Sequence, residues 1–389
     1  MTDKTIYLDH GATTPVAQSV IEEMTPFFRE KFGNPSSLYS LGREAKTEAL
    51  SKSRSTVASY LNADPKEIIF TSCATESNNL AIKGSLLNDD SPGGHLITTK
   101  VEHHSVLHAF QWLEDQGYDV SYLQPDSTGL IEPAQLEDTI TPDTKLVSVM
   151  YANNEVGTIE PIDELGKICR KYEVPFHTDA VQAYGKIPLD LDHVDLLSAS
   201  GHKIYGPKGV GILYKRKEID LEPLLSGGGH ESGLRSGTEN TAGIVGFAAA
   251  TELLEKDGAE ERARQKRLRD RITEELLKLP DTQLNGHREK RLPNNVNVNF
   301  KFVEGESIVM KLDKHGIAAS TGSACSSPNL EPSHVLLALG LPPAEAHGSL
   351  RVTLGRDNTE QQIDRFLEII PEVISELRES SPFKTTWEG

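Results

Sequence analysis

The sequence predicts an α/β protein with two domains. Its 389 residues are more than one typical domain contains. Short apolar runs that suit buried strands alternate with longer segments of helical apolar spacing. Around residues 256–258 the composition changes, and a long charged helical segment with acids and bases four residues apart follows. We therefore expect a large domain over residues 16–257 and a small domain formed by residues 1–15 and 258–389.

The composition excludes several classes of protein. A charged share of 25% and a hydrophobic share of 37% are ordinary for a soluble globular chain. The net charge of −18 argues against direct nucleic-acid binding and against an anionic membrane surface. No apolar run approaches the length of a membrane span, and the polar N-terminus shows no signal-peptide pattern. The three cysteines, Cys73, Cys169 and Cys325, fit a reducing compartment without disulfides, and we expect a cytoplasmic protein.

In the N-terminal third, each expected element has a local signal. Residues 6–8 form a short apolar run, and residues 16–32 have a helical apolar spacing that Gly-Asn-Pro-Ser-Ser at 33–37 ends. The same reading of apolar period predicts the next elements. They are a helix over 44–61, a strand over 67–70, a helix over 77–87, a strand over 94–99 and a helix to about residue 117.

The remaining elements continue this alternation. The apolar period predicts strands over 118–123, 145–150, 173–178, 194–197 and 210–214, with helices over 132–139 and 163–172 between them. Cys169 falls on the buried face of the second of these helices. The small domain adds a helix over 259–279, a strand over 296–300 and a helix over 307–315, and we expect it to pack against the N-terminal arm.

Lys203 is the first candidate for chemistry. It follows the buried run at 194–197 and enters a loop rich in glycine. A lysine held rigidly and partly desolvated at the end of a strand is a nucleophilic amine suited to Schiff-base formation. The alternative is a solvated lysine on a surface loop.

Asp179 and Gln182 follow the preceding strand and support the chemistry at Lys203. A carboxylate and an amide three residues apart can hold two edges of a flat heterocycle. Pyridoxal phosphate needs a carboxylate against its ring nitrogen and a hydrogen bond to its phenolic oxygen. Asn154, also at a strand end, is a second donor for that oxygen, unless it only makes a turn. The alternative for Asp179 is helix capping.

Two further turns suit a planar anionic cofactor. The Ser/Thr-rich turn over 71–76 leads into a helix, whose N-terminus binds anions or needs only an ordinary cap. His103 follows a strand, where an imidazole can stack on a ring and relay protons. His104 and His108 have the spacing of metal ligands on a helix, but no accompanying motif supports a metal, and we expect none.

The second half of the chain holds three more candidates. A Gly-rich run at 226–229 beside Arg235 and Thr238 either clasps a phosphate or is a mobile loop. Cys325 lies among small polar residues, where a thiol is exposed and reactive, although an incidental loop cysteine is the alternative. Arg351 is a bidentate partner for an amino-acid carboxylate, with Arg356 as the nearby competitor.

Five segments together resemble the class-V aminotransferase family and, within it, the cysteine desulfurases. They are YLDHGATTPV at 7–16, FTSCATESNNLAIKG at 70–84, HTDAVQAYGKIPLD at 177–190, DLLSASGHKIYGPKG at 195–209 and STGSACSSPNLEPSHVL at 320–336. The resemblance is collinear over nearly the whole chain. It implies the type I fold of pyridoxal-phosphate enzymes, with a mostly parallel seven-stranded sheet flanked by helices and a smaller α+β domain.

The resemblance also implies the site. Lys203, Cys325 and His103 would be catalytic, and no resident metal is implied, although Cys325 would be able to ligate an iron–sulfur cluster transiently. Arg351 and Asn34 would bind substrate. Pyridoxal 5'-phosphate would contact Ala74, Thr75, His103, Asn154, Asp179, Gln182, Ser200, His202, Lys203 and Thr238. Thr238 would complete the site of the other subunit of a homodimer. Cys73 stands where many relatives have glycine, and we expect it to be a small packed side chain.

The activity implied is desulfuration of L-cysteine to L-alanine, with the sulfur carried as a persulfide on Cys325. An acceptor protein, such as an iron–sulfur scaffold or a tRNA-thiolation protein, would receive the sulfur. The long loop from residue 321 to about 332 resembles the group that serves these acceptors, and the Arg-x-Gly-His-His-Cys pattern of the other group is absent. The alternatives are a selenocysteine lyase or an aminotransferase on the same fold, and a non-catalytic sulfur scaffold or metal-binding protein.

Overall fold

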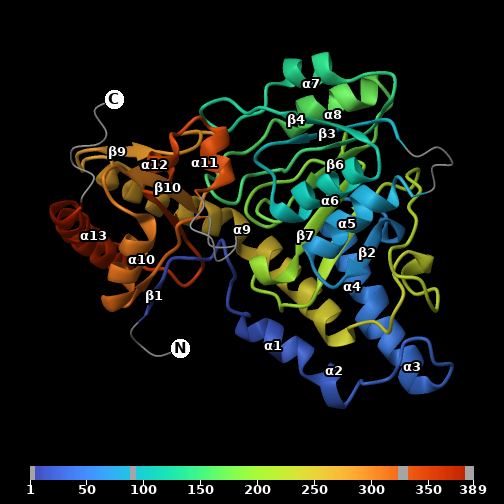
Figure 1. The fold of residues 1–389 in the computed structure, drawn as a ribbon. Coiled ribbons are helices and arrows are strands. Elements are labelled where there is room, and N and C mark those ends of the chain that lie inside the picture. Colours follow the sequence, from blue (N-terminus) through green and yellow to red (C-terminus); the bar gives the residue numbers. More distant parts are fainter. Residues whose placement is uncertain (1–4, 88–92, 323–331, 382–389) are drawn as a thin grey trace.

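The computed structural model describes residues 5–87, 93–322 and 332–381. A seven-stranded sheet forms the centre of the larger lobe (Figure 1). β8 is antiparallel to both of its neighbours, and the other strands of this sheet run in one direction, which confirms the mostly parallel seven-stranded sheet. The strand order is β2 (Ile68–Thr71), β8 (Gly211–Lys215), β7 (Leu196–Ser200), β6 (Phe176–Asp179), β5 (Thr144–Ser148), β3 (His95–Thr99) and β4 (Asp119–Leu123).

Helices cover both faces of this sheet, because its central strands are buried at nearly every position. On one face, α5 (Ala74–Gly84) and α6 (His104–Asp115) pack on side chains such as Leu96 and Leu146. On the other face, the next residues along the same strands, Ile97 and Val147, belong to the main core. That core also includes side chains from α4 (Lys52–Tyr60), α8 (Ile162–Lys171) and α9 (Thr241–Leu276).

The expected helix over residues 16–32 is divided into two helices. α1 (Gln18–Met24) ends at Thr25, and α2 (Pro26–Arg29) begins at a proline. Proline suits the first position of a helix, because it has no N–H to donate, and it interrupts a helix that already exists. The next helical stretch starts earlier than expected. It runs from α3 (Ser40–Ala45) through a π-helical turn (Lys46–Ser51) into α4.

The helix expected over residues 259–279 begins eighteen residues earlier, at Thr241, and continues unbroken through residues 256–258. Asn240 caps it by accepting a hydrogen bond from the N–H of Gly243 at 3.0 Å. Phe247 packs in the core of the large sheet, whereas Ile272 packs in a second core. The change in composition near residue 257 therefore marks the point where this helix passes from the core of the large sheet to the second core. The two cores support a division of the chain near residue 257, which stays a prediction.

The second core lies in the smaller lobe, on the left of Figure 1. Its antiparallel sheet has the order β12 (Ser349–Thr353), β10 (Asn295–Phe300) and β9 (Thr282–Leu284), and α10 (Gly305–Lys314) and α13 (Glu360–Ser380) pack against it. The N-terminal strand β1 (Ile6–Tyr7) pairs in parallel with β11 (Ile317–Ala318), and Leu8 is buried in this core. The expected packing of the N-terminal arm with this part of the chain is confirmed.

Three further α-helices of the described chain are short. α7 (Pro133–Thr139) packs beside α8, and α11 (His334–Ala338) and α12 (Pro343–Ala346) follow β11. Cys169, in α8, is buried, and this burial raises the pKa of its thiol to about 12, so the expectation of a core cysteine is confirmed. A search of the described helices for an apolar stretch long enough to cross a membrane finds none.

Candidate active site

The site lies where the parallel strands end. Asp179 is the last residue of β6, Lys203 follows β7 by three residues, and His103 follows β3 by four. The carboxyl ends of parallel strands meet at one edge of a sheet, where α/β proteins bind ligands. A cavity of about 280 Å³ opens at this edge. Among the described residues, its wall includes the predicted residues Ala74, Thr75, His103, Asn154, Asp179, Gln182, Ser200, His202, Lys203 and Arg351.

The amine of Lys203 is held by the N-terminal arm. Its Nζ donates to the carbonyl oxygens of Gly11 and Ala12, both at 2.7 Å. The N–H of Gly11 in turn donates to Oγ1 of Thr353 at 2.7 Å, which connects the arm to β12. Gly11 and Ala12 lie in one of the five recognised segments, yet no local signal predicted them, because only their backbone takes part. The cavity is therefore formed by both lobes.

Asp179 is a buried carboxylate with two hydrogen-bond donors. Its Oδ1 accepts from the N–H of Val181 at 3.0 Å, and its Oδ2 accepts from Nδ2 of Asn78 at 2.7 Å. The side chain is 4% exposed and forms part of the cavity wall. These two donors hold the carboxyl group in one orientation, in which it can accept from a protonated ring nitrogen in the cavity.

His103 caps α6 and is held in one orientation. Its Nδ1 accepts from the N–H of Ser105 at 3.1 Å and lies 2.8 Å from Oγ of the same serine. Burial, the largest cause, lowers the pKa of His103, so the ring is neutral near pH 7. Because Nδ1 accepts, the single ring proton belongs on Nε2. Nε2 is thus the nitrogen available to donate a proton in the cavity.

Arg351, rather than Arg356, lines the cavity. Its guanidinium donates to Oδ1 of Asp9 at 2.9 Å and to the carbonyl oxygen of Asn154 at 3.0 Å. Nε of Arg351 is buried and has no hydrogen-bond partner among the described residues. A buried donor without a partner is costly, and a substrate carboxylate would satisfy it. Arg356 instead pairs with Asp257.

Gln182 is fixed on both sides of its amide. Its Nε2 donates to the carbonyl oxygen of Gly11 at 2.9 Å, and its Oε1 accepts from Nζ of Lys186 at 2.8 Å. Burial, followed by the positive charges of Lys203 and Arg351, lowers the pKa of Lys186 to about 7. This lysine fixes which end of the amide points toward the N-terminal arm.

The remaining polar wall residues lie on β7 and the turn after it. Ser200 is buried at the end of β7. Nδ1 of His202 lies 3.1 Å from Oγ1 of Thr13. Burial, followed by the charges of nearby lysines, lowers the pKa of His202 to about 4, so His202 is neutral near pH 7.

The N-terminus of α5 also forms part of the cavity wall. Cys73 is the N-cap residue, and no side chain caps this eleven-residue helix among the described residues. Its first N–H groups and the positive end of the helix dipole form a site for an anion. Gly211 makes the approach of β8 possible, since a Cβ there would lie 2.7 Å from the carbonyl carbon of Cys73. Cys73 itself is partly exposed on the cavity wall, whereas we expected a packed side chain.

Three predicted site residues are not placed in this cavity. Asn34 is exposed, and its Oδ1 accepts from the N–H of Ser36 at 2.9 Å within the turn that connects two helices. Thr238 is also exposed and does not line the cavity of its own chain. Cys325 lies outside the described residues. The assignments of all three stay predictions.

His104 and His108, considered above as metal ligands, belong to a cluster of rings. The ring centroid of His104 lies 5.2 Å from that of His108 and 4.8 Å from that of His334. Burial and the neighbouring histidines lower the pKa of His104 to about 4. In the part of the chain that the structure describes, no group of three or more His, Cys, Asp or Glu side chains is arranged to hold a metal ion.

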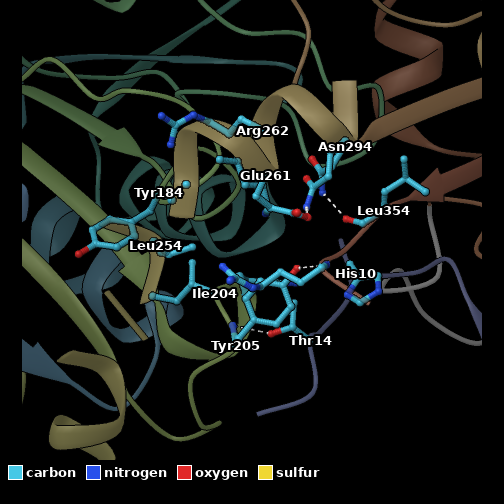
Figure 2. A pocket seen from close by; sticks show the side chains of 16 residues that line it. His10, Thr14, Tyr184, Ile204, Tyr205, Leu254, Glu261, Arg262, Asn294 and Leu354 are labelled. Carbon is cyan, nitrogen blue, oxygen red and sulfur yellow. Dashed lines mark hydrogen bonds between the residues drawn. The ribbon is translucent and has the colours of Figure 1, made fainter. Parts of the chain in front are cut away.

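Figure 2 shows a second cavity, which also has Lys203 in its wall. His10, Thr14 and Tyr205 line it, and the N–H of Tyr205 donates to Oγ1 of Thr14 at 2.7 Å. Its volume of about 30 Å³ is enough for about one water molecule. The larger cavity is therefore the one that can accept a substrate and a cofactor.

The residues of the larger cavity fit pyridoxal phosphate. A lysine amine, a buried carboxylate held in one orientation, and an uncapped helix N-terminus lie in one wall. These are the groups that an aldehyde, a pyridine nitrogen and a phosphate require. The buried Nε of Arg351 is the matching group for an amino-acid carboxylate.

Comparisons with known proteins agree with this chemistry. Residues 6–366 match the Aminotransferase class-V family. A cysteine desulfurase IscS of Methanosarcina thermophila is 51% identical to the chain, and the match covers 98% of this chain and 94% of that one. The chain is also similar to two solved structures.

The first of these is the structure of a NifS-like protein. It has a TM-score of 0.90 and 41% identity, and the match covers 96% of this chain and 100% of that one. The second is a structure of SspA in complex with cysteine, with a TM-score of 0.81 and 40% identity over 90% of this chain and 99% of that one.

Proposed function

We propose a function from the premise that the chain belongs to the class-V aminotransferase family and, within it, to the cysteine desulfurases. The protein converts L-cysteine to L-alanine and passes the sulfur, as a persulfide on Cys325, to an acceptor protein such as an iron–sulfur scaffold. The observation that carries this proposal is the cavity that combines Lys203, Asp179 and Arg351 in a chain 51% identical to a cysteine desulfurase.

Three groups of this chain would hold the cofactor. Lys203 would bind pyridoxal phosphate through Nζ, Asp179 would keep a proton on the ring nitrogen, and the N-terminus of α5 would bind the phosphate. Gln182 and Asn154 would donate to the phenolic oxygen. When bound, pyridoxal phosphate withdraws electrons from the α-carbon of the substrate and makes its proton acidic.

The substrate would be oriented by its carboxylate. Arg351 would bind that carboxylate through Nε and a terminal nitrogen, which places the α-carbon near Lys203. The amine of Lys203 would then remove the α-proton and return it to the substrate carbon. His103, with its ring proton on Nε2, would supply a proton to groups in the cavity.

Cys325 would carry out the sulfur transfer. Its thiolate attacks the sulfur of the substrate, so that an S–S bond forms on Cys325 while the bond between that sulfur and Cβ breaks. The electron pair of the broken bond goes to Cβ, which becomes the methyl group of alanine after protonation. A thiol of the acceptor protein then takes the terminal sulfur of the persulfide.

The protein would act as a homodimer in a reducing compartment, for which the cytoplasm is our proposal. Phe28, Phe32, Leu38 and Tyr39 expose between 59% and 88% of their surfaces on one stretch of the chain near α2 and α3 (Figure 1). Large apolar side chains exposed together are typical of an interface, and a second copy is the partner proposed here. Thr238 of one subunit would complete the phosphate site of the other.

The decisive experiment supplies L-cysteine and a thiol reductant to the purified protein. We expect a yellow protein that releases alanine and sulfide in equal amounts. Cys325→Ser should retain the absorption of the cofactor and lose sulfide release, whereas the core variant Cys169→Ala should keep the activity. Sulfide release at the full rate from Cys325→Ser would contradict the assigned nucleophile. A requirement for a 2-oxo acid would indicate an aminotransferase, and a strong preference for selenocysteine would indicate a lyase.

A further inference from the structure

We infer that Asn78 is a positioning residue that connects Asp179 and His103 through Ser105, so that one amide sets the state of both groups. This inference rests on the proposed function, because it assigns Asp179 to the cofactor ring and His103 to proton transfer. Asn78 lies in α5, in one of the recognised segments, but its side chain does not line the cavity.

Asn78 is fully buried and uses both of its amide hydrogens. Its Nδ2 donates to Oδ2 of Asp179 at 2.7 Å and to Oγ of Ser105 at 2.8 Å. The orientation of the amide follows from chemistry, since an ionised carboxylate only accepts and Nδ2 must therefore face Asp179. Oδ1 of Asn78 has no hydrogen-bond partner among the described residues, so the contacts of this side chain are all donations.

Ser105 connects Asn78 to His103 by hydrogen bonds. Its Oγ accepts from Asn78, so the proton of its hydroxyl is directed to Nδ1 of His103, 2.8 Å away. The N–H of Ser105 also donates to Nδ1, at 3.1 Å. Nδ1 therefore receives two donors, and the ring proton is kept on Nε2.

The connection acts differently at its two ends. The donor from Asn78 orients the carboxyl group of Asp179, and donors on Nδ1 of His103 oppose a second proton on that ring. Other groups act on His103 as well. Burial is the largest influence and lowers its pKa, while Lys203 and His334 lower it and Asp179 and Glu155 raise it. Loss of the Ser105 hydroxyl removes one donor and leaves these charges in place.

Two variants separate the two ends of the connection. Ser105→Ala removes the donor to His103 and keeps the bond from Asn78 to Asp179. Asn78→Leu removes the hydrogen bonds from Asn78 to Ser105 and to Asp179, and it keeps a side chain of similar size. Asn79→Ala is the matched control, since Asn79 is the next residue of α5 and bonds only to the carbonyl oxygen of Thr75 among the described residues. Thermal unfolding of each variant shows whether it is folded.

The first measurement is the pKa of His103 in the cofactor-free protein, from the imidazole resonances in NMR. We expect Ser105→Ala to raise it by about 0.7 unit, the equivalent of one neutral hydrogen bond. Asn78→Leu should raise it by a similar or smaller amount, because the hydroxyl of Ser105 then rotates freely. Asn79→Ala should leave it unchanged.

The second measurement follows the visible absorption of the bound cofactor as the pH is varied. Its midpoint is the pH at which the change in absorption is half complete. In Asn78→Leu, Asp179 would lose one of the two hydrogen bonds that orient its carboxyl group, so it would hold a proton on the ring nitrogen less firmly. The midpoint should move to higher pH by at least about half a unit, whereas Ser105→Ala should leave it in place.

A wild-type pKa of His103 in Ser105→Ala, or a wild-type midpoint in a folded Asn78→Leu protein, would overturn the inference. If Asn78→Leu does not fold, Ser105→Ala still decides the connection to His103. These readouts do not depend on turnover. A wild-type protein that binds the cofactor but makes no alanine would contradict the proposed function, and unshifted variants of an active enzyme would contradict only the role of Asn78.

Discussion

Buried titratable side chains near the site lose their ordinary charge because the surroundings exclude water. Burial lowers the pKa of His202 and raises that of Glu102, whose Oε2 has no hydrogen-bond partner among the described residues. Oε1 of Glu102 accepts from the N–H of Met150 at 2.7 Å and from Oγ1 of Thr99 at 3.0 Å, but the loss of water outweighs these two hydrogen bonds.

Glu160 gives a direct test of this effect on stability. Its Oε2 accepts from the N–H of Ile131 at 2.9 Å, and burial raises its pKa from 4.5 to about 8. Between these two values, the folded chain keeps a proton that the unfolded chain releases. The stability therefore falls as the pH rises, by at most about 1.4 kcal/mol per pH unit, and levels off above pH 8.

Glu160→Gln removes this titration. We expect the variant to gain free energy of unfolding relative to the wild type as the pH rises from 5 to 8, measured by urea unfolding at pH 5, 7 and 9. The exposed Glu368→Gln should show no such trend. Parallel pH profiles for the wild type and Glu160→Gln would show that this carboxyl group titrates normally in the folded protein.

At the level of elements, the loop after β8 is held by a buried ion pair. The carboxylate of Glu231 accepts from Arg54 at 2.6 and 2.9 Å and from the N–H of Phe70 at 2.8 Å. The side chain of Glu231 is 4% exposed. This ion pair anchors the loop between β8 and α9 at a point seven residues before Thr238.

Arg54→Met should therefore be strongly destabilising. It leaves the carboxylate of Glu231 buried without its cation, which costs roughly 3–5 kcal/mol in comparable cases. Arg271→Met, which removes an exposed pair with Asp364, should cost less than about 1 kcal/mol. Urea unfolding measures both. Equal losses in the two variants would show that the pair at Glu231 is no more important than a surface contact.

The elements also show where local patterns are sufficient. The central strands β3, β6 and β7 are buried at every position. Runs of apolar residues predicted β3 closely, whereas β6 and β7 begin three and two residues later than expected. α9 was predicted too short because Gly243 and Gly246 in its N-terminal half lower the local helix propensity. Packing of Phe247 and Ala250 against the large sheet stabilises that half.

At the scale of the whole molecule, the proposed homodimer predicts that two inactive chains complement each other. Lys203→Ala lacks the reactive amine, and Thr238→Val lacks the hydroxyl supplied to the other subunit. In a mixed dimer, one cavity has Lys203 from its own chain and Thr238 from the other chain. It should have normal activity, whereas the second cavity carries both changes.

Co-expression of the two variants should restore about one quarter of the wild-type rate, because random pairing makes half of the dimers mixed and each has one intact site. The measurement is alanine release per total protein, with each variant alone as the control. A rate equal to the average of the two variants alone would contradict a site shared between subunits.

The sequence by itself determined the α/β class, most strands, and the residues whose roles follow from a strand end or a turn. Lys203, Asp179, Gln182 and His103 could be predicted because each follows an apolar run, and parallel strands bring their carboxyl ends to one edge. The sequence did not decide whether Arg351 or Arg356 binds the substrate carboxylate. The fold distinguishes them, since Arg351 lines the cavity and Arg356 pairs with Asp257.

Only the tertiary structure decided which groups support these residues. The carbonyl oxygens of Gly11 and Ala12 reach Lys203 from 192 and 191 positions away, and Asn78 reaches Asp179 from 101 positions away. Backbone groups have no sequence signature, and a buried amide looks like any other polar helix residue until its neighbours are known. Contacts between distant segments depend on how the elements pack in the tertiary structure, which local periodicity does not encode.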